Sequence, residues 1–358
     1  MTDAILRAGG VRTALFTSPH LLRFTERIRI DGGEVAPHLL EPALERVLGT
    51  GVPLTYFEAA TLVAVLVMAD AGVELGVMET GLGGRLDAVT ALPAIATAIT
   101  SIGADHLDLL GPTLAHVARE KAAIARAGVP LFLPTTLAAP LREQIQIVAS
   151  AAQAPVRLVP AAAASGALLG AHQRNNAAMA IALAECAAQA VARPLGQQAV
   201  ETGLAGVQWP GRLEQVGAVL LDCAHNGEGA QALAEHLRER RERPRVLVLS
   251  IVAGKDVDAI AAALWPVVER VIVTRCASER ALHASEVAAR LPAGPVLSVT
   301  DDPGVALQQA RAHGGLAVVA GSIFLVGQIR GLLRDEPMDP VTTSDPMAAA
   351  TVTPGART

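Results

Sequence analysis

The stretch LGVMETGLGGRLDA, residues 75–88, joins a short apolar strand to a glycine-rich loop. Its first four residues predict a buried strand, and Glu79 follows that strand directly. The glycines of the loop permit positive φ and let the backbone come close to a ligand, because glycine has no side chain. The loop is not a dinucleotide fingerprint, since Leu86 stands where the third glycine of GxGxxG would be. The stretch therefore predicts one strand-and-loop unit of an α/β fold and, by itself, only weakly indicates a ligand site.

Units of this kind recur along most of the chain. Short apolar runs alternate with amphipathic helical stretches, which is typical of α/β proteins with a parallel sheet. The predicted strands cover residues 11–16, 75–78, 95–99, 130–133, 219–221, 246–249, 271–273 and 317–320. The predicted helices cover residues 57–71, 113–127, 176–190, 229–241, 257–268 and 303–312.

The length of 358 residues suits two domains, given a prior of ~150 residues per domain. The boundary is predicted near residues 208–212, where Trp209-Pro210-Gly211 interrupts the pattern before a new series of strands and helices. The first domain would then cover residues 1–207 and the second residues 208–335. Residues 336–358 hold several prolines and small polar residues without periodicity, which predicts a disordered tail.

The composition favours an enzyme that acts on small molecules. A net charge of -5 and eight aromatic residues (two Trp, one Tyr, five Phe) argue against a nucleic-acid-binding surface. The longest apolar run, residues 59–69, is far shorter than the ~20 residues that span a bilayer, so no membrane association is expected. The first residues lack an export signal, which predicts a cytoplasmic location. The three cysteines have no CxxC spacing and indicate neither a disulfide framework nor a zinc site.

Three predicted strands are followed directly by polar residues that could bind a ligand. Ser18 follows the strand at 11–16, Glu79 the strand at 75–78, and His106 the strand at 95–99. If these strands are neighbours, a hydroxyl, a carboxylate and an imidazole meet at one sheet edge, where ligands bind in open parallel sheets. Mainly oxygen ligands suit Mg²⁺ bound to nucleotide phosphates. The alternative is that Ser18 caps the next segment, Glu79 pairs with Arg85 and His106 bonds locally, and spacing alone slightly favours it.

Two further positions carry a functional and a structural interpretation. Lys121 lies in an alanine-rich predicted helix, where a surface pair with the neighbouring Glu120 is the simpler interpretation. In the second domain, Asp222-Cys223-Ala224-His225-Asn226 follows a strand and could bind a nucleotide ribose or face a second substrate. Capping of the next helix by Asp222 and Asn226 is the competing interpretation.

A phosphate loop of the form GxxxxGK[ST] is absent from the sequence. The single Gly-Lys pair, Gly254-Lys255, is followed by Asp256 and has Leu249 where the first glycine belongs. If ATP is used, its phosphate cradle is incomplete in these 358 residues.

Taken in order, several of these segments resemble the folylpolyglutamate synthase and dihydrofolate synthase family within the Mur ligase group. The matching segments are Thr17-Ser18-Pro19-His20-Leu21, Glu26-Arg27-Ile28-Arg29, Thr55-Tyr56-Phe57-Glu58, residues 81–88, Asp105-His106, Glu120-Lys121, His172-Gln173, Asn176-Ala177, Pro210-Gly211-Arg212, residues 222–226 and residues 321–327. The resemblance implies an α/β fold in which a Mur ligase central ATPase domain is followed by a smaller Rossmann-like C-terminal domain, the glutamate ligase domain.

The resemblance also implies roles for individual residues. Ser18, Glu79 and His106 match magnesium ligands, and Lys121 matches a lysine that is carbamylated in this group. Asn176, Arg212 and Asp222 match nucleotide contacts, and His225 lies beside them in the same motif. The segments that match the pterin-binding parts of the family are Thr55, Tyr56, Phe57, Glu58, Leu86, Asp87 and Ala88. Lys121, Arg212 and His225 are the predicted catalytic residues.

The implied activity is ATP- and Mg²⁺-dependent ligation of L-glutamate to dihydropteroate, to folyl(poly)glutamate, or to both. The γ-phosphate of ATP activates a substrate carboxylate as an acyl phosphate, which the glutamate amine attacks, with Arg212 stabilising the transferred phosphoryl group. A monomer acting on these small molecules is expected. A Mur-type ligase for a cell-wall precursor is less well supported, because Tyr56-Phe57-Glu58 and Thr17-Ser18-Pro19-His20 favour folate.

One departure from the family concerns ATP binding. Family members carry a glycine-rich phosphate loop and the start of its helix just before a segment like Asp3-Ala4-Ile5-Leu6-Arg7-Ala8-Gly9, and here Met1 falls inside that helix. The first strand of the sheet would be missing with the loop. We therefore expect the 358-residue chain to be a poor catalyst. One hypothesis places the natural start of the protein upstream, and the other describes a truncated family member that binds folate or a partner without turnover.

Overall fold

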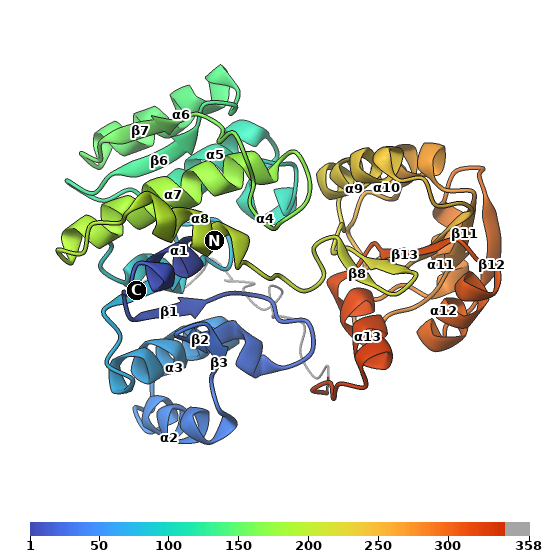
Figure 1. The fold of residues 1–358 in the computed structure, drawn as a ribbon, viewed down its shortest axis with the longest axis horizontal. Helices are drawn as coiled ribbons and strands as arrows, with labels where there is room; N and C mark the ends of the chain where they lie inside the picture. The colour runs from blue at the N-terminus through green and yellow to red at the C-terminus, as the bar shows by residue number, and fades with distance from the viewer. Residues whose placement is uncertain (341–358) are drawn as a thin grey trace, which may run out of the picture.

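Two α/β lobes make up residues 1–340, the part of the chain that this computed structural model describes (Figure 1). The N-terminal lobe contains two small sheets, and the C-terminal lobe contains one larger sheet. Residues 336–340, the first of the predicted tail, lie against the N-terminal lobe, where Asp339 N donates to Leu22 O at 2.8 Å. The rest of that tail, residues 341–358, lies outside the described residues.

The first sheet of the N-terminal lobe has the strand order β3-β2-β1-β4. Its members are β1 (Thr13–Phe16), β2 (Ile28–Ile30), β3 (Gly33–Glu34) and β4 (Leu75–Met78). β1 runs parallel to β4 and antiparallel to β2. The strands near residues 11–16 and 75–78 are therefore neighbours, which meets for these two strands the condition under which Ser18 and Glu79 converge on one sheet edge.

The second sheet consists of three parallel strands in the order β5-β6-β7. Its members are β5 (Thr97–Ala98), β6 (Leu131–Pro134) and β7 (Val156–Val159). β5 pairs with β6 and not with β4, so the third predicted strand end belongs to a separate sheet. The helix α7 (Gln173–Ala190) packs on Leu75 and Val77 of β4 and also on β6, which leaves β4 and β5 as open edges near the same helix.

Local sequence signals explain where the helices of this lobe begin. Thr55 and Glu58 form a capping box at the start of α3, in which Thr55 Oγ1 accepts from Glu58 N. Buried Asp3 holds α1 to β1, because Thr13 Oγ1 donates to Asp3 Oδ1 at 2.6 Å. Besides α7, the helices and 3-10 turns of the lobe are α1 (Thr2–Ala8), η1 (Phe24–Arg27), α2 (Pro37–Leu48), α3 (Tyr56–Asp70), η2 (Ala88–Ala91), α4 (Leu107–Leu110), α5 (Leu114–Ala122), α6 (Ala139–Ala151) and α8 (Gln197–Ala205).

The C-terminal lobe is built on a six-stranded sheet in the order β12-β11-β10-β13-β9-β8, parallel except for β8. The central strands are buried on both faces, which explains their uninterrupted apolar sequences. The strands are β8 (Glu214–Val216), β9 (Val219–Leu221), β10 (Arg245–Leu249), β11 (Arg270–Val273), β12 (Val296–Val299) and β13 (Leu316–Ala320). The helices are α9 (Gly227–Glu239), α10 (Val257–Leu264), η3 (Trp265–Val267), α11 (Ala284–Arg290), α12 (Pro303–Ala312) and α13 (Ile323–Arg334).

The elements that the sequence did not predict are mainly short or partly exposed. β8 and β12 alternate between half-buried and exposed residues and lack the continuous apolar run of a central strand. The helix predicted to reach residue 127 ends at Ala122 as α5, and Gly128 follows with φ of 74°. Within residues 1–340, no helix is both long and apolar enough to cross a membrane.

The core of the C-terminal lobe should be sensitive to loss of volume at Leu220. This residue is fully buried in the cluster between the sheet and α9. Leu220→Ala is expected to lower the free energy of unfolding by about 2–5 kcal/mol, because it leaves a cavity. Leu332→Ala, whose residue is 63% exposed on α13, is the control and should change it by less than about 0.5 kcal/mol. Urea unfolding followed by tryptophan fluorescence measures both, and equal effects would contradict this assignment of the core.

Candidate active site between the two lobes

Ser18 and Glu79 meet at the carboxyl ends of two neighbouring strands. Ser18 N donates to Glu79 Oε2 at 3.0 Å. Desolvation by the surrounding protein raises the pKa of Glu79, and the Ser18 N–H, Arg212, Arg27 and Lys121 oppose that rise. Glu79 nevertheless stays exposed, so water or an ion can reach its carboxylate. The alternative pairing of Glu79 with Arg85 is wrong, because Arg85 Nε instead contacts Glu120 Oε1 at 2.9 Å.

His106 adopts a left-handed backbone conformation, with φ of 54°, at the start of α4. A residue other than glycine in this region costs about 1–3 kcal/mol, and such strain is common at functional sites. Burial lowers the pKa of His106, and Asp105 opposes that shift. Its Nε2 lies 3.8 Å from Asp105 Oδ1, and Lys255 and Arg280 of the C-terminal lobe are among the charged groups that influence its pKa.

Asp105 joins the two lobes. Its Oδ1 accepts a hydrogen bond from Lys255 Nζ at 2.6 Å, and its Oδ2 lies 3.2 Å from Asn226 Nδ2 and 3.4 Å from His225 Nε2. Burial alone would raise the pKa of Asp105, but the contacts with His225 and Lys255 lower it well below its usual range. The loop before α4 is therefore held by two loops of the C-terminal lobe, those after β9 and β10.

Lys121 lies half-buried in α5 and faces the acidic groups of this junction. Burial lowers the pKa of Lys121, and Asp105, Glu228 and Glu79 oppose that shift. Its neighbour Glu120 contacts Arg85, so the predicted alternative of a Lys121–Glu120 surface pair is not what the structure shows. A primary amine with a lowered pKa is more often neutral, which is the form that reacts with carbon dioxide.

Asp222 is buried beyond β9 and holds the linker between the lobes. It accepts hydrogen bonds from Leu213 N and Ala224 N, each at 2.9 Å. Burial raises the pKa of Asp222, and Leu213 N–H, Arg212 and His172 are among the groups that oppose the rise. Asp222 therefore braces the linker and is not the cap of α9.

The residues predicted to bind the nucleotide come from both lobes. The exposed Arg212 opposes the rise in pKa of both Glu79 and Asp222, which burial causes, so it lies near both carboxylates. Asn176 lies on α7, where its Nδ2 donates to Gln173 Oε1 at 2.9 Å. Gln173 in turn contacts His172, whose pKa is influenced by Asp222 and Arg212. The start of α7 thus faces the linker.

His225 and Asn226 belong to the loop between β9 and α9. His225 Nδ1 lies 2.9 Å from Cys223 O, which orients the other ring nitrogen toward Asp105. Asn226 caps α9, because its Oδ1 accepts from Gly229 N at 2.9 Å. The capping interpretation is therefore confirmed for Asn226.

A cavity of about 500 Å³ lies beside the glycine-rich loop and contains four of the seven residues predicted to bind the pterin. Its lining is Glu58, Arg85, Leu86, Asp87, Ala88, Thr90, Ala91, Ala123 and Arg126. Asp87 shapes the wall, since its Oδ2 accepts from Gly81 N at 2.7 Å and from Leu82 N at 2.9 Å. Leu86 is 83% exposed and available for contact with a ligand.

The other three predicted pterin-binding residues do not line the cavity but directly precede its lining residue Glu58 at the start of α3. Thr55 is the helix cap, and the Phe57 ring packs so closely on Gly81 that a Cβ there would lie 2.7 Å from the ring. Tyr56 belongs to a stack in which the Arg27 guanidinium lies 5.5 Å from its ring centre. Glycine is required at position 81 because the aromatic ring occupies the space of a side chain.

The metal prediction involves a mixed set of donors. Within residues 1–340, no group of three His, Cys, Asp or Glu side chains is arranged to hold a metal ion. The predicted set contains only two residues of those types, Glu79 and His106, and its third member is the Ser18 hydroxyl. The structure joins Ser18 to Glu79 directly, whereas His106 lies on the Asp105 side of the junction.

Sequence reasoning passed over Lys255, which the structure places against Asp105. A signal was present in the composition: Lys121 and Lys255 are the only two lysines among 29 basic residues, and both lie at this junction. Arginine serves at every other basic position of the sequence. Lysine and arginine differ in size, hydration and hydrogen-bond geometry, so the use of lysine at these two positions indicates that each needs a property of lysine that arginine lacks.

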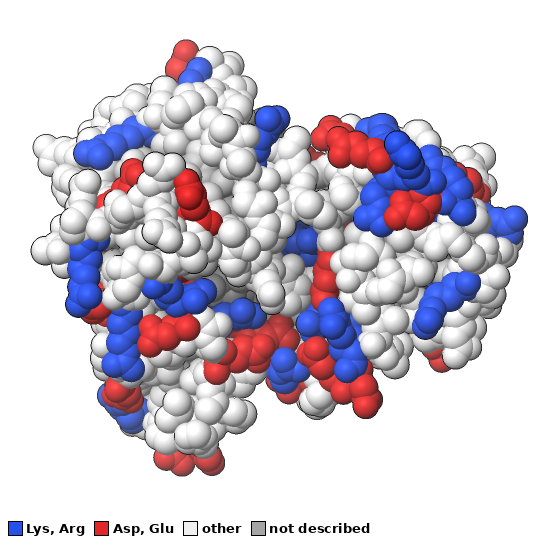
Figure 2. Space-filling model, viewed as in Figure 1, with Lys and Arg blue, Asp and Glu red and all other residues white. Residues whose placement is uncertain are grey.

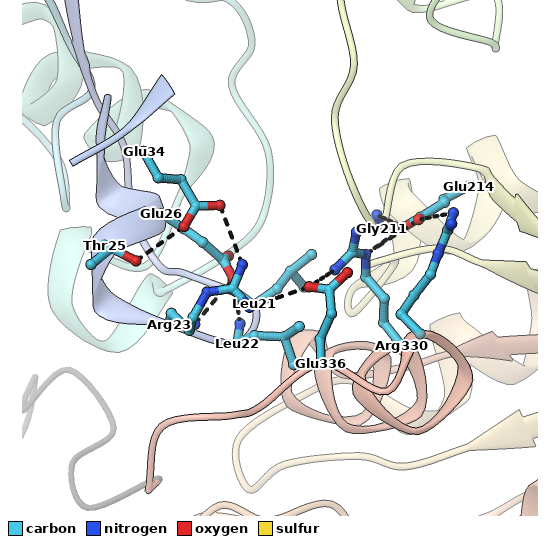
Figure 3. Close-up of polar contacts among 11 residues, drawn as sticks. Leu21, Leu22, Arg23, Thr25, Glu26, Glu34, Gly211, Glu214, Arg330 and Glu336 are labelled. Atoms are coloured by element: carbon cyan, nitrogen blue, oxygen red, sulfur yellow. Dashed lines mark hydrogen bonds and ion pairs between the residues drawn. The ribbon is translucent and has the colours of Figure 1, made fainter. Parts of the chain in front are cut away.

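A second set of contacts joins the lobes beside α13 (Figure 3). Arg23, in the loop after β1, and Arg330, on α13, both contact Glu336 Oε2, at 3.2 and 2.9 Å. Arg330 also contacts Glu214 Oε2 at 3.2 Å, and that oxygen accepts from Gly211 N in the linker. Figure 2 shows acidic and basic side chains gathered together at the lower junction of the lobes.

Comparisons with known proteins agree with this architecture. The family described as Mur ligase, glutamate ligase domain, matches residues 211–323. The dihydrofolate synthase/folylpolyglutamate synthase of Mycobacterium tuberculosis is 35% identical over 80% of this chain and 69% of its own length. A probable bifunctional folylpolyglutamate synthase/dihydropteroate synthase of Haloferax volcanii is 32% identical over 92% of this chain. The chain spans 44% of the length of that relative and of a similar one from Halobacterium salinarum.

Solved structures give the same result. Escherichia coli FolC in complex with DHPP and ADP superposes with a TM-score of 0.84 at 26% identity, over 93% of this chain and 84% of that one. Mycobacterium tuberculosis folylpolyglutamate synthase complexed with ADP and AMPPCP has a TM-score of 0.83 at 30% identity, over 95% and 88%. The fold and the junction between the lobes thus define a Mur ligase scaffold, as predicted. Within that class, the chain belongs to the folylpolyglutamate synthase/dihydrofolate synthase family.

The lowered pKa of Lys121 can be measured directly. Because the sequence has two lysines, reductive methylation with ¹³C-formaldehyde gives two lysine signals besides that of the amino terminus. The Lys121 signal is expected to titrate below the ordinary lysine value of 10.5, since burial disfavours the charged form. Lys121→Arg assigns the signal by removing it. A Lys121 midpoint at or above 10.5 in the NMR titration would contradict the proposed burial of its amine.

Proposed function

We propose that this protein is an ATP-dependent ligase that joins L-glutamate to dihydropteroate, to folyl(poly)glutamate, or to both. One observation carries the proposal. Arg212 of the linker is close enough to influence both the accessible Glu79 carboxylate of the N-terminal lobe and the buried Asp222 of the C-terminal lobe, so the junction brings one cation and two carboxylates together. Such a junction can hold a nucleotide and a carboxylate acceptor together, as the family membership requires. Residues 1–207 would bind ATP and the pterin, and residues 208–335 would bring the glutamate.

Ser18, Glu79 and His106 are the residues we assign to Mg²⁺. The fit rests on chemistry: a hydroxyl, a carboxylate that stays open to solvent, and an imidazole are acceptable donors for a hard cation that retains waters and phosphate oxygens. When bound, Mg²⁺ would neutralise charge on the phosphoryl group in transfer. Lys121, as a carbamate, would add a further carboxylate to this group, and its lowered pKa favours that modification.

The residues of the chain have separate tasks in the proposed reaction. Asn176 and Asp222 position the nucleotide, and Arg212 places positive charge where the γ-phosphate passes to the substrate carboxylate. The amine of glutamate attacks the carbonyl carbon of the resulting acyl phosphate, which forms the amide bond, releases inorganic phosphate and leaves a proton to be lost from the nitrogen. His225, which contacts Asp105, lies in the C-terminal lobe at the junction where we place this step. Closure of the C-terminal lobe over the bound substrates would exclude water, which would otherwise hydrolyse the acyl phosphate.

The cavity beside the glycine-rich loop is the site we assign to the pterin. Its two carboxylates, Glu58 and Asp87, can accept hydrogen bonds from the amino and ring N–H groups of a pterin, and Leu86 offers an apolar contact. We further propose that the protein acts as a monomer in the cytoplasm and uses neither a membrane nor a nucleic acid. The net charge of -5 supports the last point.

Because these 358 residues contain no GxxxxGK[ST] phosphate loop, the test of activity includes a protein in which such a loop is supplied. The assay compares the 358-residue chain with a chimera in which the loop-bearing segment of the Mycobacterium tuberculosis relative precedes Met1, where the open edges of β4 and β5 can receive its strand. The chimera is expected to release ADP in a reaction that requires both glutamate and dihydropteroate or a folate. No turnover in either protein would overturn the proposed activity. Calorimetric binding of dihydropteroate without turnover would favour the non-catalytic alternative.

The metal ligands are tested in the same chimera. Glu79→Ala and His106→Ala are each expected to reduce ligation at least about 100-fold, because charge on the transferred phosphoryl group loses its stabilisation. Asp70→Asn, in an exposed ion pair with Arg46, is the control and should leave the rate unchanged. Melting temperatures establish that all variants fold. Unchanged turnover in both site variants would remove the magnesium assignment.

Asp87 tests the assignment of the pterin cavity. Asp87→Ala removes the acceptor of two loop N–H groups and is expected to raise KM for dihydropteroate about tenfold while KM for ATP stays the same. Asp302→Ala is a matched control, since Asp302 also accepts two backbone N–H groups but lies at the start of α12. An equal rise in both KM values in the steady-state assay would speak against a specific pterin role.

A further inference from the structure

We propose that Asp105 and Lys255 form a latch between the lobes that places His106 at the metal site when the lobes are together. The inference rests on the proposed function, because it takes His106 as a metal ligand. Asp105 and Lys255 are positioning residues in this role, since neither touches the reacting atoms.

The first argument is the geometry of one oxygen atom. Asp105 Oδ1 accepts from Lys255 Nζ at 2.6 Å and also from His106 N at 3.0 Å. The lysine of the C-terminal lobe and the backbone amide that fixes the strained conformation of His106 therefore share one acceptor. If the lysine withdraws, Asp105 Oδ1 loses its charged partner and is held less firmly, which weakens the bond that supports the positive φ of 54° at His106.

The second argument is that the same short loop is gripped at several points by the other lobe. Asn226 and His225 contact the second oxygen of Asp105. A Cβ on Gly103 would lie 2.5 Å from Glu228 Oε2, so the first turn of α9 packs directly on the backbone of this loop. Figure 1 shows α4 and α9 facing each other across the upper part of the junction. The position of His106 is thus tied to the C-terminal lobe.

The third argument concerns the choice of lysine. The Lys255 side chain is 10% exposed, and Asp105 is 25% exposed. A compact ammonium group fits this narrow contact, whereas the wider, planar guanidinium would need more room. In a sequence that otherwise uses arginine, lysine is retained here and at Lys121. Arg280 supports the loop that carries Lys255, because its Nη2 donates to Ala253 O at 3.0 Å.

Lys255→Met is the decisive variant, tested in the 358-residue chain with Mn²⁺ as the probe and electron paramagnetic resonance as the readout. If only charge mattered, removal of a positive charge near a cation site would strengthen Mn²⁺ binding. The latch requires the opposite, a dissociation constant about tenfold higher, as for other residues that position a metal ligand. The ¹⁴N signal of a metal-bound imidazole in pulsed spectra should weaken in the same variant.

Further variants separate the latch from general damage. Asp105→Asn should weaken Mn²⁺ binding, and the double variant with Lys255→Met should bind no more weakly than the weaker single variant, because one contact is lost only once. Asp70→Asn makes the same chemical change in the exposed pair with Arg46 and should bind Mn²⁺ like the parent protein. Melting temperatures show whether each variant is folded.

The outcomes distinguish the latch from the function on which it rests. If Glu79→Gln and His106→Ala bind Mn²⁺ like the parent, the assigned metal site is wrong and the latch falls with it. If those two lose Mn²⁺ while Lys255→Met binds it as tightly as the parent, or more tightly, the latch is overturned and the metal site stands. Weaker binding in Lys255→Met together with a weakened ¹⁴N signal supports the latch.

Discussion

The parallel pairing of β1 with β4 is the constraint on which the rest of the site depends. In this register Phe16 stands opposite Met78, so both strands end together, and Ser18 and Glu79 leave the sheet at one edge. A slip of one residue would turn the side chains of β1 to the other face and bury the wrong set. Arg212 of the linker and the loops of the C-terminal lobe lie near the Ser18–Glu79 pair. They approach the N-terminal lobe at the end of the sheet where β1 and β4 terminate.

The contacts around Glu336 and the contacts around Asp105 both join the lobes, but they lead to different residues of the proposed active site. Arg330 pairs with both Glu336 and Glu214, and Glu336 also pairs with Arg23. Glu214 in turn accepts a hydrogen bond from the backbone N–H of Gly211, the residue before Arg212, so these contacts fix the orientation of the linker there. Gly211 is tightly enclosed there, since a Cβ would lie 2.8 Å from Cys223 Sγ. The contact at Asp105 instead reaches the residue next to a proposed metal ligand. Movement of the C-terminal lobe would therefore act on Arg212, which we assign to the transferred phosphoryl group, and on His106 by separate routes.

Much of the fold could be predicted because it depends on local patterns. The strands at residues 75–78 and 219–221 were predicted with their observed bounds, since short apolar runs ending in polar residues mark buried parallel strands. The meeting of Ser18 and Glu79 depends on the pairing of β1 with β4, which the apolar pattern of each strand does not specify. The separation of β5 from β4 could not be predicted, because pairing between distant strands leaves no trace in either strand's own sequence. For the same reason, Lys255 was passed over: its partner Asp105 lies 150 residues away.

The two lysines show how composition can point to a site when motifs do not. A carbamate needs a primary amine that can lose its proton, which arginine does not supply because its guanidinium stays charged. That argument explains Lys121 but not Lys255, whose ammonium is paired with Asp105 and gains from staying charged. At Lys255 the relevant property is size, since one donor must reach a single carboxylate oxygen between two lobes. If Lys121 carries the carbamate we propose, two different physical properties favour lysine at the two junction positions, and arginine is adequate where neither applies.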